Sequence, residues 1–532
     1  GAVSTVVAAV VGLAVLSAAG LAPVLVAVGR RWIAVPLVPL AGAAVASSAA
    51  AAYVAFGVSF LAWFVVLAFA VAAASLGWWA LDPGRSRPGG GPGGADRRVV
   101  VAGAVGAAAI AVACAASLRG LRTPTVGFDA RALWVMRPGW FLQSHHQLLI
   151  DLKVRDLVLT QSAYPPLVSA ASAVAWKVTG VHTARMGVVV TSLLNACALA
   201  AAALAVCEVG RRAAVDASGR RAAVDASGRR AWGGASGARA SGDGASGARA
   251  SGERPPWVPM VAGIGAAVLL VLVAAGITEP FLTNGYADPI WSLAAVGAVA
   301  WGLQSPGDRA ARAAAVVLVL VAGGSKDEGF VTAVAIIGLI ALRSLAGVVA
   351  DHGWRARWSR WAGPVALAAA ELAVIGAWPE LMRAVGARGA SSTFTLRTEL
   401  ASRSSAVAHG MAPYLHVLVV AVPVAAVGGL VLSGVRRRTG TGNDLWAWAA
   451  LSCGLVAVAG ALVTGQGEIG PWLRSTVHRI TEFPALAAWW IVATWGVVAV
   501  CGLTTGRHGA LPGDEASGAG APVDAEPVAV GA

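Results

Sequence analysis

The sequence predicts an all-α polytopic membrane protein with about 13 transmembrane helices. Its 532 residues are 57% hydrophobic and only 12% charged, and the mean hydropathy is +0.72. A water-soluble fold of this length has no way to bury so much apolar surface, so the bilayer must act as its solvent. The apolar residues also form runs of about 20, the length that crosses the hydrocarbon core. Basic residues gather in the short connections between these runs, as in membrane proteins of fixed orientation.

Each expected span is an apolar run bounded by charged residues, glycine or proline. Tilting or local thinning of the bilayer permits spans somewhat shorter than about 20 residues. Before a long polar interruption the expected spans are 2–28, 32–54, 57–81 and 98–118. After it they are 183–208, 257–276, 289–304, 310–324, 329–348, 362–378, 412–433, 445–465 and 483–504.

The distribution of arginine predicts the orientation. The net charge of +14 does not indicate nucleic-acid binding, because the basic residues cluster in short loops between spans. With these loops in the cytoplasm, we expect a multi-pass protein of the cell (plasma) membrane. Its expected partners include the lipids of the bilayer. The external loops are then 119–182, 277–288, 325–328, 379–411 and 466–482. Every later basic loop stays in the cytoplasm only if the helix expected at 165–178 lies on the outer surface and does not cross the membrane.

The chain divides into six segments by composition. Residues 211–256 repeat RRAAVDASG at 211–219 and 220–228, and such polar, low-complexity sequence predicts a disordered cytoplasmic loop. The tail 507–532 is expected to be disordered as well. The other segments are 1–97 (extra N-terminal spans and a Pro/Gly linker), 98–210 (a core span, the first external loop and the next span), 257–350 (further core spans) and 351–506 (C-terminal spans with external loops).

Candidate site residues gather in the external loops. Asp129 lies between Phe128 and Trp134, and Arg131 and Arg137 follow it closely. A lone loop aspartate is ordinarily a solvated acid or a helix cap. Here, however, cations that can pair with a phosphate surround it. A second external acid, Asp288, stands at the mouth of another span. A carboxylate can take the proton from an attacking hydroxyl while cations stabilise a phosphate leaving group.

Later loops add further polar residues. Lys326 lies between two short spans, where it either pairs with Asp327 and Glu328 or binds a lipid-linked phosphate. The loop 466–482 could bind a sugar or a head group, or serve only to anchor the chain at the interface. Its cationic candidates are Arg474, His478 and Arg479. No metal site is expected, because the adjacent histidines at 145 and 146 point apart and no acid lies at ligand spacing.

Five motifs, in order over roughly residues 98–350, resemble the GT-C-fold membrane glycosyltransferases. The likeness is to the polyprenyl-phosphate-sugar-dependent branch, relatives of protein O-mannosyltransferases and lipid A aminoarabinose transferases. The motifs are Phe-Asp-Ala-Arg-Ala-Leu-Trp at 128–134, Tyr-Pro-Pro-Leu at 164–167, the pair Arg211-Arg212, Asp288 at the head of a span, and the turn Ser325-Lys326-Asp327-Glu328-Gly329. Two features depart from that family pattern: Ala163 stands where relatives often carry an acid, and three spans precede the usual first one.

The resemblance implies a GT-C-like helical bundle with a helical first external loop. It implies an inverting transfer of a sugar from a polyprenyl-phosphate carrier to a glycan, lipid or protein acceptor at the external face. Asp129 would be the general base, and Asp288 a second catalytic acid that orients the acceptor or the sugar. The substrate-binding candidates are Arg131, Arg137, Tyr164, Lys326, Arg474, His478 and Arg479. The lipid-linked sugar is the donor substrate, and no cofactor is required.

Two other classes stay open. A transporter or flippase of lipid-linked sugars would want ionisable residues at mid-membrane, and the span centres hold almost none. A non-catalytic membrane assembly protein would tolerate the loss of Asp129, whereas the transferase would not.

Overall fold

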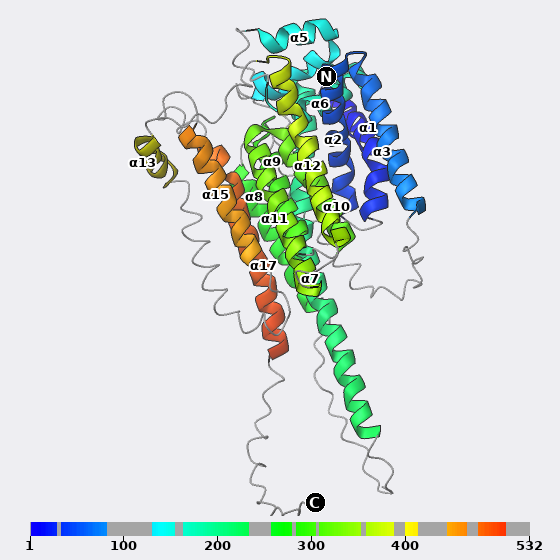
Figure 1. The fold of residues 1–532 in the computed structure, drawn as a ribbon, viewed down its shortest axis with the longest axis vertical. Coiled ribbons are helices and arrows are strands. Elements are labelled where there is room, and N and C mark those ends of the chain that lie inside the picture. Colours follow the sequence, from blue (N-terminus) through cyan, green and yellow to red (C-terminus); the bar gives the residue numbers. More distant parts are fainter. Residues whose placement is uncertain are drawn as a thin grey trace, which may run out of the picture.

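The computed structural model (Figure 1) describes residues 2–28, 33–81, 130–154, 163–233, 257–278, 284–304, 308–352, 358–387, 400–412, 444–464 and 477–506. In these ranges all regular structure is helical, and no strand occurs. The predicted all-α class is therefore confirmed.

The helices follow one another in a simple order. The first three are α1 (Ala2–Val28), α2 (Ala34–Phe56) and α3 (Phe60–Leu81). The predicted external loop 119–182, called the first long loop from here on, contains η2 (Ala130–Val135), η3 (Arg137–Leu142), α5 (His145–Lys153) and α6 (Leu167–Thr179). The remaining elements are α7 (Ala184–Gly233), α8 (Trp257–Thr278), α9 (Asp288–Gln304), α10 (Arg309–Ser325), α11 (Asp327–His352), α12 (Trp358–Ala384), α13 (Leu400–Met411), α15 (Asp444–Thr464) and α17 (Glu482–Gly506).

Eleven of the expected spans coincide with helices to within a few residues at most ends. Of the other two, 98–118 lies outside the described residues, and so does 412–433 apart from its first residue. Within the described part, eight helices are long and apolar enough to cross a membrane, namely α1, α2, α3, α7, α8, α11, α12 and α17. The chain is therefore a multi-pass, all-helical membrane protein, and the count of about 13 spans stays a prediction.

The prediction for the low-complexity segment is wrong in its first part. Helix α7 continues without a break from its apolar half through residues 211–233. Alanine and arginine are among the best helix formers, so the two RRAAVDASG repeats propagate a helix that the preceding span has already nucleated. Figure 1 shows this end of α7 projecting below the other helices. Residues 234–256 lie outside the described part of the chain.

The short helix α6 lies inside the bundle. It has 13 residues, fewer than a crossing helix needs, and it ends at Gly180, whose φ of 68° closes the helix in a left-handed cap. Every side chain from Leu167 to Trp176 is buried, because α1, α2 and α7 pack around it. We expected this helix to lie on the outer surface. Instead, α1, α2 and α7 bury it.

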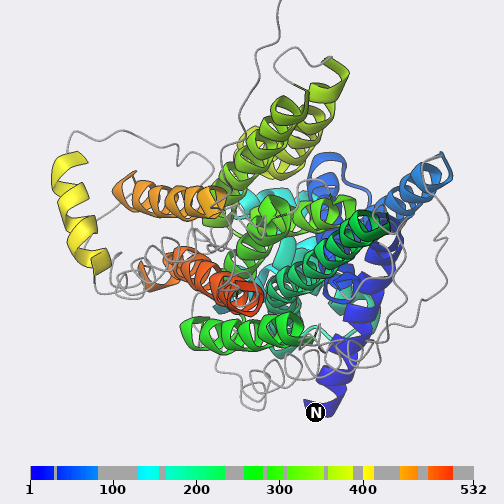
Figure 2. The ribbon, with the colours of Figure 1, turned by 90° about the horizontal axis from the view of Figure 1, so that it is seen from below.

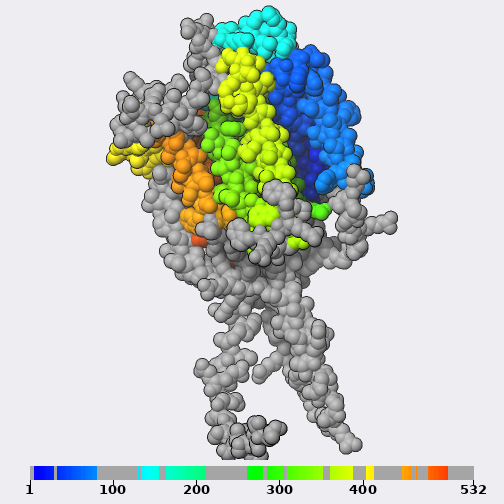
Figure 3. All heavy atoms as spheres, in the orientation of Figure 1, coloured from blue at the N-terminus to red at the C-terminus, as the bar shows by residue number. Residues whose placement is uncertain are grey.

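The leading helices α1 and α2 form a close pair that also holds the first long loop. A Cβ added at Gly42 would overlap the backbone carbonyl of Leu16 on α1. From the end of α2, the Tyr53 hydroxyl donates to the Gln143 carbonyl oxygen at 2.6 Å. The His145 ring Nε2 lies 3.0 Å from the Val54 carbonyl oxygen. In the space-filling view α5 covers the upper end of this group (Figure 3).

The middle helices bring several chain segments to that same upper end. Helices α9, α10 and α11 follow one another as antiparallel neighbours, so the start of α9 and the α10–α11 junction lie together. Helix α17 packs beside α7, α8 and α9, whereas α13 contacts α15 at the edge of the bundle (Figure 2). The polar residues that begin α9, α11 and α17 thus meet beneath the first long loop.

Replacing Gly42 by alanine should destabilise the protein by about 1–3 kcal/mol, because the new methyl group meets backbone that has no room to move. The matched control is Gly77→Ala on α3, where a Cβ meets nothing within 4 Å. That change should be neutral or slightly stabilising, since alanine favours helix over glycine. Thermal unfolding of the purified protein in detergent measures both, and equal melting temperatures would contradict the packing described here.

Candidate functional site

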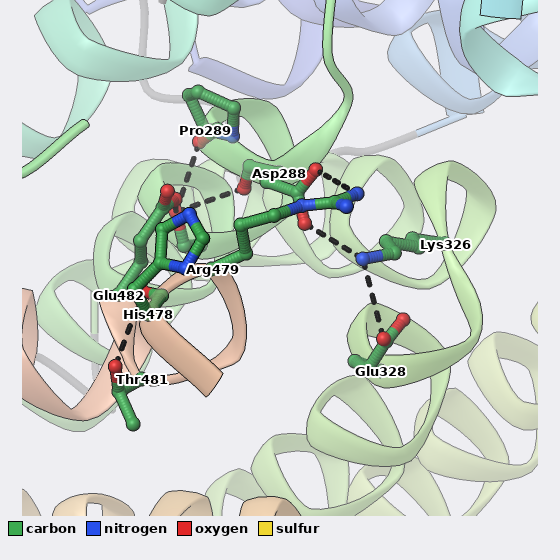
Figure 4. A network of polar contacts seen from close by, with 9 residues as sticks. Asp288, Pro289, Lys326, Glu328, His478, Arg479, Thr481 and Glu482 are labelled. Carbon is green, nitrogen blue, oxygen red and sulfur yellow. Dashed lines mark hydrogen bonds and ion pairs between the residues drawn. The ribbon is translucent and has the colours of Figure 1, made fainter. Parts of the chain in front are cut away.

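A fully buried carboxylate, Asp288, forms the centre of the candidate site. It is the first residue of α9 and its exposed fraction is 0%. The Lys326 Nζ lies 2.6 Å from its Oδ1, and the Arg479 Nη2 lies 2.9 Å from its Oδ2 (Figure 4). Each carboxylate oxygen therefore accepts a charge-assisted hydrogen bond from a different segment of the chain.

The turn before α9 explains how Asp288 reaches this place. Gly285 has a φ of 90°, a conformation that other residues rarely adopt. A Cβ on Gly285 would lie 3.1 Å from a methyl of Val188 on α7 and 3.3 Å from one of Val135 in η2. Glycine is thus required both for the backbone conformation and for the close approach to η2. The turn holds Asp288 next to the first long loop.

Lys326 is the single residue between α10 and α11, with an extended backbone. Its ammonium group also lies 3.2 Å from Glu328 Oε1. Of the two neighbouring acids that could pair with Lys326, Glu328 does so. The shorter contact is to Asp288, which the sequence did not predict. Burial alone would lower the pKa of Lys326, but the carboxylates of Asp288 and Glu328 outweigh that effect and raise the pKa above its usual value. The lysine is therefore positively charged at neutral pH.

A second carboxyl, Glu482, lies against the start of α9. It is the first residue of α17, and 1% of it is exposed. Its Oε2 is 3.2 Å from the Ser292 hydroxyl, which also lies 3.0 Å from the Asp288 carbonyl oxygen. Among the described residues, Glu482 Oε1 and Glu328 Oε2 are buried without a hydrogen-bond partner.

Aromatic rings and an arginine from the first long loop border this cluster. Trp134 and Tyr164 stack with centroids 5.6 Å apart and planes 10° from parallel. The Arg137 Nη2 donates to the Tyr164 carbonyl oxygen at 2.9 Å, and its guanidinium lies 5.6 Å from the Trp140 ring. On the other side, the Arg479 guanidinium lies 4.7 Å from the ring of Tyr286. Flat apolar surfaces thus flank the charged groups.

Burial changes the proton affinity of the two loop residues. It lowers the pKa of the Arg137 guanidinium to about 10, against the opposing effect of Asp327, so the arginine stays charged at neutral pH. Burial also raises the pKa of the Tyr164 phenol well above its usual value, and the carboxylates of Glu328, Asp327 and Asp288 add to the increase.

The structure brings together part of the predicted site. Asp288, Lys326 and Arg479 are in direct contact, and His478 precedes Arg479 in the chain beside them (Figure 4). Arg137 contacts Tyr164. Asp129 and Arg474 lie outside the described residues, and of Arg131 only the backbone, in η2, is described.

Ser292 was not predicted as a site residue. Glu482 was included only in the loop 466–482, which was predicted to bind a sugar or a head group or to anchor the chain, and was not chosen individually. One signal could have found the glutamate, because Glu482 stands at the head of a span as Asp288 does. Within the described residues, no group of three or more His, Cys, Asp or Glu side chains could hold a metal ion.

Comparison with protein-family models, with curated proteins and with solved structures finds no match to this chain.

Replacing Asp288 by asparagine should lower the free energy of unfolding by about 3–5 kcal/mol, because two buried cations lose their counter-charge. The double variant Asp288→Asn/Lys326→Met should recover part of this loss, since one of the unpaired cations is removed. Denaturant unfolding in mixed micelles measures both.

The control for that experiment is Glu380→Gln, which breaks the exposed pair of Glu380 with Arg383 on α12. Their side chains are 68% and 51% exposed, so this loss should stay within about 1 kcal/mol. If Asp288→Asn cost no more than Glu380→Gln, the buried cluster would not stabilise the fold.

Proposed function

We propose that the protein is a membrane glycosyltransferase. It transfers a sugar from a polyprenyl-phosphate carrier to a glycan, lipid or protein acceptor at the external face of the cell membrane, with inversion. The observation that carries this proposal is the buried contact of Asp288 with Lys326 and Arg479, next to the first long loop. The order of motifs along the sequence supports it independently.

A charged cluster at this depth is costly, and that cost supports a functional role. Removing charges from water costs several kcal/mol per ion even after relaxation. Ionisable groups inside membrane bundles are rare and mark binding or transport paths. Here carboxyl groups from the starts of α9, α11 and α17 meet cations from the α10–α11 junction and from the segment before α17. Stacked aromatic rings from the first long loop lie near the turn before α9. This set of groups suits a ligand with an anionic end and a hydroxyl-rich end.

In the proposed reaction Asp129 accepts the proton of the acceptor hydroxyl. The hydroxyl oxygen attacks the anomeric carbon, the bond from that carbon to the phosphate oxygen breaks, and the electron pair leaves with the polyprenyl phosphate. One displacement inverts the anomeric centre and needs no covalent intermediate. Ala130, the described neighbour of Asp129, lies close to the turn that positions Asp288, since a Cβ on Gly285 would be 3.7 Å from the Ala130 Cβ.

Cations stabilise the departing phosphate in this proposal, and Arg137, Lys326 and Arg479 are the candidates. Because Asp288 binds two of them through both of its oxygens, its proposed role is to position these cations. Arg131, Arg474 and His478 are proposed as further contacts to the lipid-linked sugar, and Tyr164 as part of the aromatic wall.

One observation favours the transporter or flippase as a second candidate. Glu371 lies in α12, between Pro364 and Pro379 of that helix, and only 7% of it is exposed. Span centres were expected to hold almost no ionisable residues, and this buried glutamate is an exception. Intramembrane acids and interrupted helices are typical of ion-coupled transporters.

Replacing Asp129 by asparagine should reduce sugar transfer in proteoliposomes by about 100-fold or more, because the amide keeps the shape but removes the base. Radiolabelled polyprenyl-phosphate sugars and a cell-envelope extract supply the substrates. The control is Asp151→Asn in α5, in the same loop, where the carboxylate accepts a hydrogen bond from the Gln147 amide. Equal turnover by the wild type and Asp129→Asn would overturn the assignment of the base.

Replacing Glu371 by glutamine separates the two candidate functions. A transferase whose chemistry takes place at the Asp288 end should keep its transfer rate within about twofold, because an isosteric change in α12 leaves that end intact. A flippase driven through Glu371 should lose movement of a fluorescent lipid-linked sugar across the liposome membrane. Loss of lipid movement with no detectable transfer in the wild type would favour the flippase.

A further inference from the structure

The cluster around Asp288 holds buried carboxyl oxygens that no described donor contacts. Three carboxyl groups, from Asp288, Glu328 and Glu482, surround the two cations Lys326 and Arg479. Both oxygens of Asp288 and one oxygen of Glu328 contact these cations. The remaining oxygen of Glu328 and one oxygen of Glu482 are buried and, among the described residues, have no hydrogen-bond partner.

Glu482 is the more informative of the two open carboxyls. It is 1% exposed, whereas the Glu328 side chain is 17% exposed. The Oε2 of Glu482 lies 3.2 Å from the Ser292 hydroxyl, whose single hydrogen is also within reach of the Asp288 and Pro289 carbonyl oxygens. Its Oε1 has no hydrogen-bond partner among the described residues. A buried acceptor without a donor destabilises a fold measurably. Glu482 therefore has one oxygen within reach of a hydroxyl donor and one buried oxygen that no described donor contacts.

The chemistry of these open atoms selects the ligand. A phosphate oxygen has no hydrogen to give at neutral pH, and carboxylates repel it. A sugar hydroxyl donates one hydrogen bond to such an oxygen, and neighbouring hydroxyls on a ring can reach two acceptors. Buried polar groups that await a hydroxyl also discriminate strongly against ligands that lack it.

We propose that Glu482, with Glu328 as a second acceptor, binds the hydroxyl groups of a sugar ring at the Asp288 cluster. Glu482 is thus a specificity-determining residue, and Arg137, Lys326 and Arg479 remain the candidates for binding the phosphate. This inference rests on the proposed function and extends it. The sugar is either the one carried by the donor lipid or one belonging to the acceptor, and both present the same hydroxyl chemistry.

Binding to the full-length protein in lipid nanodiscs tests the proposal with three probes. They are polyprenyl phosphate without a sugar, polyprenyl-phosphate hexose, and a soluble neutral hexose oligosaccharide. The variant is Glu482→Gln, which keeps the shape and an acceptor for Ser292 but replaces one carboxyl oxygen by an NH2 group that cannot accept a hydrogen bond. The control is Glu380→Gln, which removes an exposed acid of α12 far from the cluster in sequence.

Glu482→Gln should weaken binding of a sugar-bearing probe by about tenfold and leave bare polyprenyl phosphate unchanged. A loss confined to polyprenyl-phosphate hexose identifies the donor sugar, and a loss confined to the oligosaccharide identifies the acceptor. Equal losses for the bare and the sugar-bearing lipid overturn the proposal, because Glu482 would then act on the head group or on the fold. Unchanged binding of both sugar-bearing probes overturns it as well.

The same binding experiment tests the proposed transferase function separately from the role of Glu482. A wild-type protein that binds neither polyprenyl lipid contradicts the transferase, whatever Glu482 does. The hydroxyl-binding role is then decided by the oligosaccharide alone. Binding that Glu482→Gln weakens keeps the role, and no binding overturns it.

Discussion

The contact of one buried carboxylate with two cations determines how the ends of this bundle are arranged. Asp288 begins α9, Lys326 joins α10 to α11, and Arg479 lies just before α17. In a membrane, apolar side chains gain little by leaving lipid for a neighbouring helix, so apolar burial alone does not select which helices meet. A buried carboxylate that needs two counter-charges does select them. Most of the apolar surface is compatible with several packings, and the ion pairs favour one.

The packing around that contact depends on small residues. Helices α1 and α2 approach closely at Gly42, and the Gly285 turn lets η2 approach α9. The leading helices thereby become part of the core and hold the first long loop through Tyr53 and His145. The position of Arg137 and Trp134 next to the Asp288 cluster therefore depends on helices far from it in sequence.

The sequence predicted the helices well and the site only in part, and the reason is physical. Each span carries its own hydropathy signal, so most helices could be located one at a time. The helix at 211–233 was not predicted because its composition shows only that the segment cannot form a hydrophobic core. Composition does not show that a helix begun in the preceding span continues through it. Asp288, Lys326 and Arg479 were each chosen as polar residues in external loops. Their mutual contact, across 38 and 191 positions, depends on packing between helices and has no local signature.

The carboxyls of this cluster share a feature that links the fold to its chemistry. Asp288, Glu328 and Glu482 each lie in the first turn of a helix, in α9, α11 and α17 respectively. The positive end of a helix dipole stabilises a negative charge there by about 0.3–1 kcal/mol. Three such ends pointing at one place would attract any anion, including a phosphate. The carboxyls already occupy these positions, so free anions are disfavoured unless further cations lie nearby. Arg137, on the first long loop, supplies such a cation. We therefore expect the phosphate to lie towards Arg137 and the hydroxyl-rich part of the ligand to lie towards Glu482.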